Sequence, residues 1–168
     1  MSSEHVETFT DSLGGDATVH EATAETAGEA IEEAITEPAI GTPVPIDGVS
    51  LSETPVETDF SPADLEAAAT GVTPAAVGIS NYGTVTLPSD DEGTELASLY
   101  CRRHVAVIAA SDIEPGMKAA YEHLSEDFAE RVDTQVLATG PSATADMGTL
   151  VHGVHGPHEV HIVVVTDR

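Results

Sequence analysis

The stretch TGPSATADMGTLVHGVHGPHEVHIVVV, residues 139–165, decides the fold of this chain. Its two glycine–proline pairs, Gly140-Pro141 and Gly156-Pro157, break regular structure, so neither half can form one long helix. Residues 162–165 form a continuous β-branched run, which is typical of a strand covered on both faces. A short strand over 135–138 is predicted to run into the first turn. The polar residues between the turns are therefore expected on loops held by rigid strands, where sites are common.

Strands and helices alternate along the chain, which indicates an α/β domain. A β-hairpin is predicted near residues 76–87, because two short apolar runs flank Asn81-Tyr82-Gly83 and glycine is permissive in a turn. The other expected elements are a strand over 17–20, a helix after Thr23 that stops before Pro38, irregular chain with at most one strand over 39–60, and a short helix from Pro62 closed by Gly71.

A second buried strand is predicted over 104–110. Ser111 and Glu114 follow it at the spacing of a helix capping box. The expected helix carries an apolar stripe at helical spacing. The members of that stripe are Ile113, Met117, Ala120, Tyr121, Leu124 and Phe128.

Residues 1–15 are expected to form a flexible acidic tail, and residues 16–168 a single domain with a modest core. The first residues, MSSEHVETF, lack the apolar stretch of a signal peptide, and no segment reaches transmembrane length. A cytoplasmic protein is therefore expected. The single cysteine, Cys101, excludes an internal disulfide and a cysteine-based metal cluster.

Acidic residues dominate the charge of the chain. It has 30 Asp and Glu against 5 Lys and Arg, a formal net charge of -25, and no Lys or Arg before Arg102. Such a surface repels nucleic acid and anionic membranes, so neither is an expected partner. A hydrophobic content of 40% argues against a disordered acidic protein. We interpret the charge as adaptation to very high salt, where the Debye length falls to about 3 Å at 1 M, and expect an extreme halophile as the source.

Four blocks of sequence resemble the LUD-domain family, of the lactate-utilisation protein C type. They are TGPSATAD at 139–146, LVHGVHGP at 150–157, GVTPAAVGISNYGTVTL at 71–87 and HVAVIAASDI at 104–113. The resemblance implies the architecture of the NagB/RpiA/CoA-transferase-like superfamily, a mainly parallel sheet flanked by helices.

The predicted site consists of loop residues with hydroxyls, an imidazole or glycine N–H groups, which suit a small carboxylate or phosphate. Its expected substrate- or anion-binding residues are Thr139, Gly140, Ser142, Thr144, Asp146, His155, Gly156, Asn81 and Gly83. Two alternatives stay open: hydroxyls that only satisfy local backbone, and a His155 buried against the sheet. Relatives commonly carry arginine where Ala143 stands, which weakens the case for a strongly charged ligand.

Three further features have two interpretations each. His152, His155, His158 and His161 recur at every third residue, but glycines prevent a helix and no cysteine completes the set, so no metal is expected. Arg102-Arg103 either hold an anion or pair with carboxylates, and could lower the pKa of Cys101. Tyr82 either walls the pocket or covers the hairpin.

The hairpin turn argues against thioester chemistry. CoA-transferase relatives use a glutamate nucleophile, and LUD proteins commonly show Glu-Thr-Gly at this turn. Here Asn81 stands instead, and an amide is neither a nucleophile nor a general base.

The resemblance implies a subunit of an L-lactate utilisation system that oxidises lactate to pyruvate with iron–sulfur partner proteins. The clusters would belong to those partners, since one cysteine cannot hold a cluster, and this chain would carry no cofactor. Whether the chain is itself catalytic stays open; if so, it belongs to an NAD-independent lactate-oxidising complex. The alternatives are a free-standing enzyme or sensor for a phosphorylated metabolite (a sugar phosphate or nucleotide), and a pure scaffold.

Overall fold

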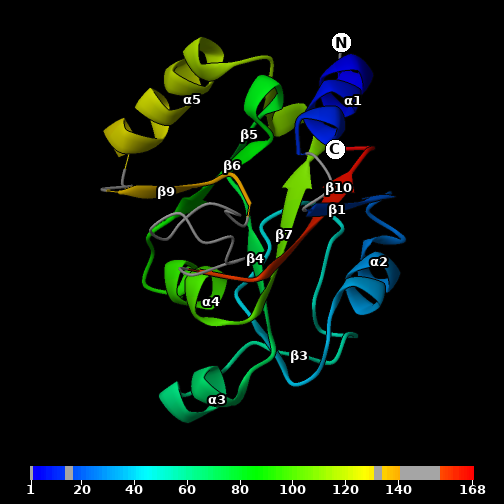
Figure 1. Cartoon of the computed structure of the whole chain (residues 1–168), viewed down its shortest axis with the longest axis vertical. Coiled ribbons are helices and arrows are strands. Elements are labelled where there is room, and N and C mark those ends of the chain that lie inside the picture. The colour runs from blue at the N-terminus through cyan, green and yellow to red at the C-terminus, as the bar shows by residue number, and fades with distance from the viewer. Residues whose placement is uncertain (1, 14–16, 131–133, 141–155) are drawn as a thin grey trace, which may run out of the picture.

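The centre of the molecule is a six-stranded sheet in the order β1-β10-β7-β4-β2-β3, in which every pair of neighbours is parallel (Figure 1). The computed structural model describes residues 2–13, 17–130, 134–140 and 156–168. The strands of this sheet are β1 (Ala17–Ala22), β2 (Ala39–Gly41), β3 (Val56–Glu57), β4 (Thr70–Pro74), β7 (Arg103–Ala109) and β10 (Glu159–Val165). The α/β prediction with a mainly parallel sheet is confirmed.

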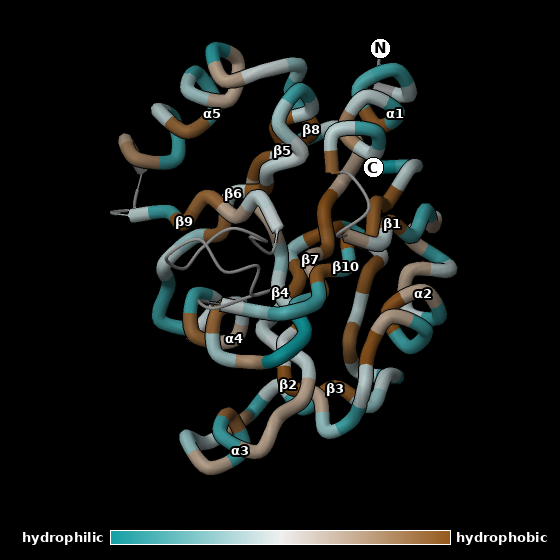
Figure 2. The backbone as a smooth tube through the Cα atoms, viewed as in Figure 1, coloured by the Kyte–Doolittle hydropathy of each residue, from teal (hydrophilic) through white to brown (hydrophobic). Residues whose placement is uncertain are grey.

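Strands β7 and β10 lie side by side in the middle of the sheet, and Figure 2 shows them as hydrophobic along most of their length. Both were predicted from their β-branched runs. Val105, Val107 and Val163 face one side, against helix α2 (Ala27–Ala34). Ala106, Ile108 and Ile162 face the other side. Both faces of the sheet are therefore covered, as parallel sheets require.

A second, four-stranded sheet packs beside the first in the order β8-β5-β6-β9. Its strands are β5 (Val77–Ile79), β6 (Thr84–Pro88), β8 (Ile113–Glu114) and β9 (Gln135–Ala138). Strands β5 and β6 form the predicted antiparallel hairpin. The short 3-10 helix η2 (Ser80–Tyr82) and Gly83, at φ 58°, make its turn, so glycine is needed there for its left-handed backbone.

The first residues form a packed helix, which corrects the expectation of a flexible tail. Helix α1 (Ser2–Leu13) buries Val6 and Phe9, at 6% and 0% exposure. They join the core cluster on the face of β7 and β10 that carries Ile108. The acidic residues of α1 are exposed, so the acidic composition of this segment hid its core-facing stripe.

Two other local predictions were wrong at their boundaries. Ser111 and Glu114 do not cap a helix, because β8 pairs with β5 there and helix α5 begins only at Met117 (Met117–Glu130). Helix α3 (Pro62–Ala67) starts at Pro62 as predicted, with a capping box between Ser61 and Asp64, but it ends before Gly71, which belongs to β4. Helix α4 (Thr94–Tyr100) and the strand β4 were not predicted, and residues 39–60 contain the two short strands β2 and β3 where at most one was expected.

The predicted stripe of α5 is only partly a core face. Ala120 and Leu124 are buried and pack against β5, whereas Tyr121 and Phe128 are exposed. Within the parts of the chain that are described, no helix is both long and apolar enough to cross a lipid bilayer.

Candidate functional site

A pocket of about 340 Å³ lies between the two sheets, beneath α4. Strands β6 and β9 form one wall, and the beginnings of β7 and β10 form the other. Thr139 and Gly140, which follow β9, line it together with Gly156 and Pro157, which precede β10. The two glycine–proline turns that the sequence singles out therefore meet at one pocket, at least through these four residues.

The predicted site residues divide into three groups. Thr139, Gly140 and Gly156 line the pocket. Asn81 lies in a separate depression beside Pro115 and Gly116, so it is not brought to the pocket. Ser142, Thr144, Asp146 and His155 lie outside the described residues, and their grouping stays a prediction.

Gly83 does not line the pocket, but the residue that follows it contacts Thr139, which does. It packs against the end of α1, where an added Cβ would lie 2.7 Å from the Leu13 amide nitrogen. The next residue, Thr84, is buried, and its hydroxyl lies 2.9 Å from the Thr139 hydroxyl. Tyr82 is exposed and is not part of the pocket lining, so the interpretation as an aromatic wall is not supported.

His104 is the pocket residue that the sequence analysis missed. It sits near the start of β7 on the face turned towards the second sheet, and its side chain is 1% exposed. Its Nε2 lies 2.9 Å from Oγ1 of Thr73, a buried threonine of the neighbouring strand β4. Burial lowers the pKa of His104 to about 4, so the ring is neutral at ordinary pH. No loop motif marks His104, and only its position in a buried strand hints at it.

Gly71 explains how α4 comes close enough to roof the pocket. In the register of β4 and β7, Gly71 stands beside His104. A Cβ at Gly71 would lie 1.9 Å from the carbonyl oxygen of Ala97, so only glycine lets α4 lie this near the sheet. The approach places Ser98 and Leu99 in the pocket wall.

The described lining of the pocket is mainly apolar, with a few neutral polar groups. Hydroxyls of Ser98 and Thr139, the imidazole of His104 and two glycines supply hydrogen-bonding capacity. Among these described lining residues there is no lysine, arginine, aspartate or glutamate. Such walls suit a small ligand that combines an apolar part with a few oxygen atoms.

The two adjacent arginines have structural partners. Arg103 donates hydrogen bonds to the Glu159 carboxylate and to the carbonyl oxygen of Ala34, and Arg102 lies 3.9 Å from Glu159. The bonds from Arg103 hold the pKa of Glu159 below its usual range. Of the two interpretations, carboxylate pairing is therefore the one that the contacts support.

Cys101 is a packing residue. Its side chain is buried against Ile40 and Ala97, and burial raises its pKa to about 11. The expectation that neighbouring arginines lower this pKa was wrong, because desolvation of the thiolate outweighs them.

Two histidines of neighbouring strands stack on each other at one edge of the sheet. Nε2 of His20 lies 3.0 Å from Nδ1 of His161, and the ring centroids are 5.3 Å apart. Burial is the main cause that lowers the pKa of His161 to about 4. In the described ranges, no three His, Cys, Asp or Glu side chains converge as metal ligands. His152 and His155 lie outside those ranges, so the absence of a metal stays a prediction.

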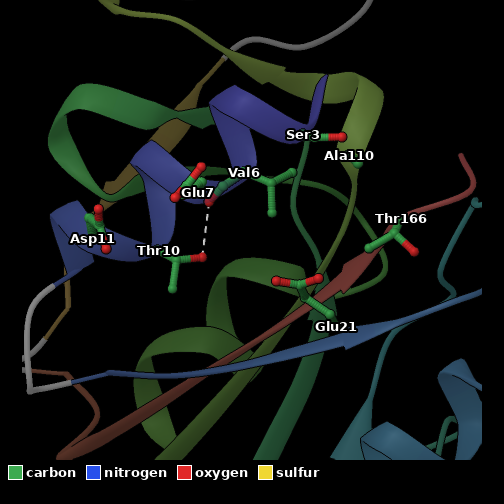
Figure 3. A pocket seen from close by; sticks show the side chains of 8 residues that line it. All are labelled: Ser3, Val6, Glu7, Thr10, Asp11, Glu21, Ala110 and Thr166. Carbon is green, nitrogen blue, oxygen red and sulfur yellow. Dashed lines mark hydrogen bonds between the residues drawn. The ribbon is translucent and has the colours of Figure 1, made fainter. Parts of the chain in front are cut away.

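A second cavity, of about 450 Å³, lies under α1 at the carboxyl ends of β1, β7 and β10 (Figure 3). Ligands of open α/β sheets often bind at this edge. Here Glu7 and Asp11 of α1 and Glu21 of β1 contribute carboxylates, and no basic side chain is among the described lining residues. Like charges repel, so this cavity is a poor site for the predicted anion.

Acidification should lower the free energy of unfolding, because two histidines are held neutral in the folded protein. Both His104 and His161 have pKa values near 4 against an ordinary 6.5, so the unfolded chain binds protons that the folded chain does not. Their contribution to stability is complete above pH 6.5 and is lost as the pH falls towards 4. Urea unfolding of wild type and His104→Gln in molar KCl should show a shallower fall for the variant between pH 6.5 and about 5. Equal slopes would contradict a buried neutral ring.

Comparisons with known proteins agree with the fold. The sequence model of the LUD domain matches residues 12–165. "Lactate utilization protein C" of Geobacillus sp. (strain WCH70) is 36% identical over 107 residues, which are 61% of this chain and 44% of that protein. The protein of the same name from Bacillus subtilis (strain 168) is 33% identical over 107 residues, 61% of this chain and 45% of its own length. The chain thus matches less than half the length of these curated relatives.

A solved structure shows the same architecture over the whole chain. The crystal structure of a DUF162 family protein from Deinococcus radiodurans superposes with a TM-score of 0.73 at 23% identity, over 98% of both chains. At this identity the likeness concerns the fold alone. The match of the domain model to nearly the entire sequence is the stronger finding. This chain belongs to the LUD domain family.

Proposed function

We propose that this protein is a subunit of an L-lactate utilisation system that works with iron–sulfur partner proteins to oxidise lactate to pyruvate. The observation that carries the proposal is the sequence identity of 36% over 107 residues and 32% over 104 residues to two proteins named lactate utilization protein C, together with the LUD domain match over residues 12–165. The clusters would lie on the partners, because the single cysteine of this chain is buried and one thiolate cannot hold a cluster.

The pocket beneath α4 is the proposed site for a small carboxylate. Hydroxyls and main-chain N–H groups hold carboxylates without a charged side chain, and Thr139, Gly140 and Gly156 bring such groups to one place. The predicted residues Ser142, Thr144, Asp146 and His155 belong to the segment between Gly140 and Gly156, both of which line the pocket. Asn81 is no part of this proposal, since it lines another depression.

Deletion of the gene in its own host should abolish growth on L-lactate while growth on pyruvate continues. A tagged copy should restore growth and retain iron–sulfur proteins when isolated from cells grown on lactate. The matched control is a tagged copy isolated from cells grown on pyruvate, which should retain less of them. Normal lactate growth of the deletion strain, together with the absence of iron–sulfur proteins from the isolate, would remove the proposal.

The phosphorylated-metabolite alternative has less support in the pocket. A phosphate dianion is usually held by arginine or lysine, and neither is among the described lining residues. A thermal-shift screen in molar KCl separates the two, because a ligand that binds the native state raises its apparent stability. A shift with a sugar phosphate or nucleotide, and none with lactate or pyruvate, would favour the alternative.

A further inference from the structure

We infer that His104 determines the ligand specificity of the pocket by hydrogen bonding to the hydroxyl or keto oxygen on carbon 2 of a small 2-hydroxy or 2-oxo acid. This inference rests on the proposed small-carboxylate site and adds a recognition residue that no sequence motif indicates. The carboxylate itself would be held elsewhere in the pocket, by the groups at Thr139, Gly140 and Gly156.

The geometry fixes the ring of His104. Strand β7 holds the residue on a fully buried face, and Thr73 contacts one of its two nitrogens, Nε2. Thr73 is itself completely buried in β4, so it cannot turn away to water. Helix α4 packs against Gly71, which is next to His104 in the register, and contributes Ser98 and Leu99 to the pocket that His104 also lines. A ring held in this way can be selective, because it does not reorganise to suit other ligands.

The chemistry of the pair suits both members of a hydroxy acid and oxo acid couple. If the Thr73 hydroxyl donates to Nε2, the proton of the neutral ring sits on Nδ1. An Nδ1–H group donates equally well to a hydroxyl oxygen and to a keto oxygen. Burial keeps the ring uncharged, so recognition does not depend on an ion pair.

Because apolar side chains surround the His104 ring, a ligand that does not hydrogen bond to this ring should bind more weakly. Leu87, Leu99 and Val160 line the same pocket and offer no hydrogen bond. A ligand that lacks the oxygen on carbon 2 would place an apolar carbon against the imidazole N–H and leave that group without the hydrogen bond that the ligand oxygen supplies. Sites of this kind reject the analogue that lacks the polar group much more strongly than hydrophobic sites reject an extra methylene. Propionate is that analogue, since it keeps the carboxylate and the methyl end of lactate.

Isothermal titration in molar KCl with L-lactate, pyruvate and propionate tests the inference on the full chain. Wild type should bind lactate and pyruvate at least about 10-fold more tightly than propionate. In His104→Leu this preference should fall towards 1, while the Kd for propionate changes by no more than about 2-fold. His104→Gln should keep part of the preference, because an amide still offers a hydrogen bond. His158 is exposed, so His158→Gln is the matched control, and its preference for lactate and pyruvate over propionate should equal that of wild type.

Several results would overturn the assignment. An equal loss of affinity for all three ligands in a folded His104→Leu would show a purely structural role. An unchanged preference, or no binding of any of the three acids by wild type, would also refute it. The last result would leave the subunit role standing if the deletion strain still fails to grow on lactate, so the two proposals fail separately.

A spectroscopic measurement on wild type covers the case in which His104→Leu does not fold. Nitrogen-15 spectra of the imidazole rings should show pyruvate, but not propionate, shifting the resonances of one ring that stays neutral at pH about 5.5. Among the histidines in the described ranges, His161 is the other one whose pKa is lowered, and His161→Gln removes its signals. Failure of pyruvate to shift the remaining neutral ring would contradict the inference.

Discussion

Replacing Phe9 with alanine should lower the free energy of unfolding by about 3–5 kcal/mol, the usual range for removing a buried phenylalanine. Phe9 is completely buried and belongs to the core cluster that includes Val85, Ile108 and Ile162. Removal of its ring would leave a cavity between α1 and the face of the central sheet. Guanidinium unfolding followed by circular dichroism in molar KCl measures the change.

Thr8→Ala is the matched control on the same helix. Thr8 is exposed, and its hydroxyl donates a hydrogen bond to the carbonyl oxygen of Glu4, one turn earlier. Its replacement should change the free energy of unfolding by no more than about 0.5 kcal/mol. If Phe9→Ala cost as little as Thr8→Ala, residues 2–13 would behave as the flexible tail that the acidic composition suggests, and α1 would not be part of the core.

The signal for α1 was present in the sequence but was weak. Val6, Phe9 and Leu13 follow the i, i+3, i+7 spacing of one helix face. Three apolar positions among acidic residues resemble the composition of a solvated terminus, which is why composition alone misleads. What makes this helix stable is its burial against β7 and β10, a tertiary contact that a local pattern does not contain.

The central strands were predictable because a run of β-branched and small apolar residues is typical of a buried strand. Strands β7 and β10 are runs of β-branched and small apolar residues, covered on both faces. Strand β4 has the sequence TGVTP, and glycine and proline are both depleted in strands. It is a strand because β2 and β7 pair with it on either side. Its identity therefore depends on the sheet around it.

The candidate site was predictable only in its loop residues. The glycine–proline pairs marked turns, and the described ends of those turns do line one pocket. His104 and Ser98 come from the interior of a strand and a helix, where no turn chemistry marks them. Ser98 reaches the pocket because α4 packs against β4 at Gly71, while His104 lines it from the neighbouring strand β7. Both depend on contacts between segments that are distant in the sequence.

Gly71→Ala should be severely destabilising, by about 3 kcal/mol or more, although it adds a single methyl group. The new Cβ would lie 1.9 Å from the Ala97 carbonyl oxygen and 2.8 Å from its carbonyl carbon. Both are backbone atoms, so the clash cannot be relieved by a rotamer change, and α4 must move away from β4. The movement would carry Ser98 and Leu99 out of the pocket wall, so the fraction that still folds should bind lactate more weakly.

Gly28→Ala supplies the matched control for this substitution. Gly28 lies in α2, and an added Cβ there would meet only the Thr54 methyl group, at 3.9 Å. Alanine has the higher helix propensity, so this variant should be more stable than wild type by about 0.5–1 kcal/mol and should bind lactate normally. Thermal unfolding and titration of both variants in the same salt give the comparison. A Gly71→Ala protein as stable as wild type would mean that α4 does not lie against β4 in solution, and the pocket that depends on this contact would lose its roof.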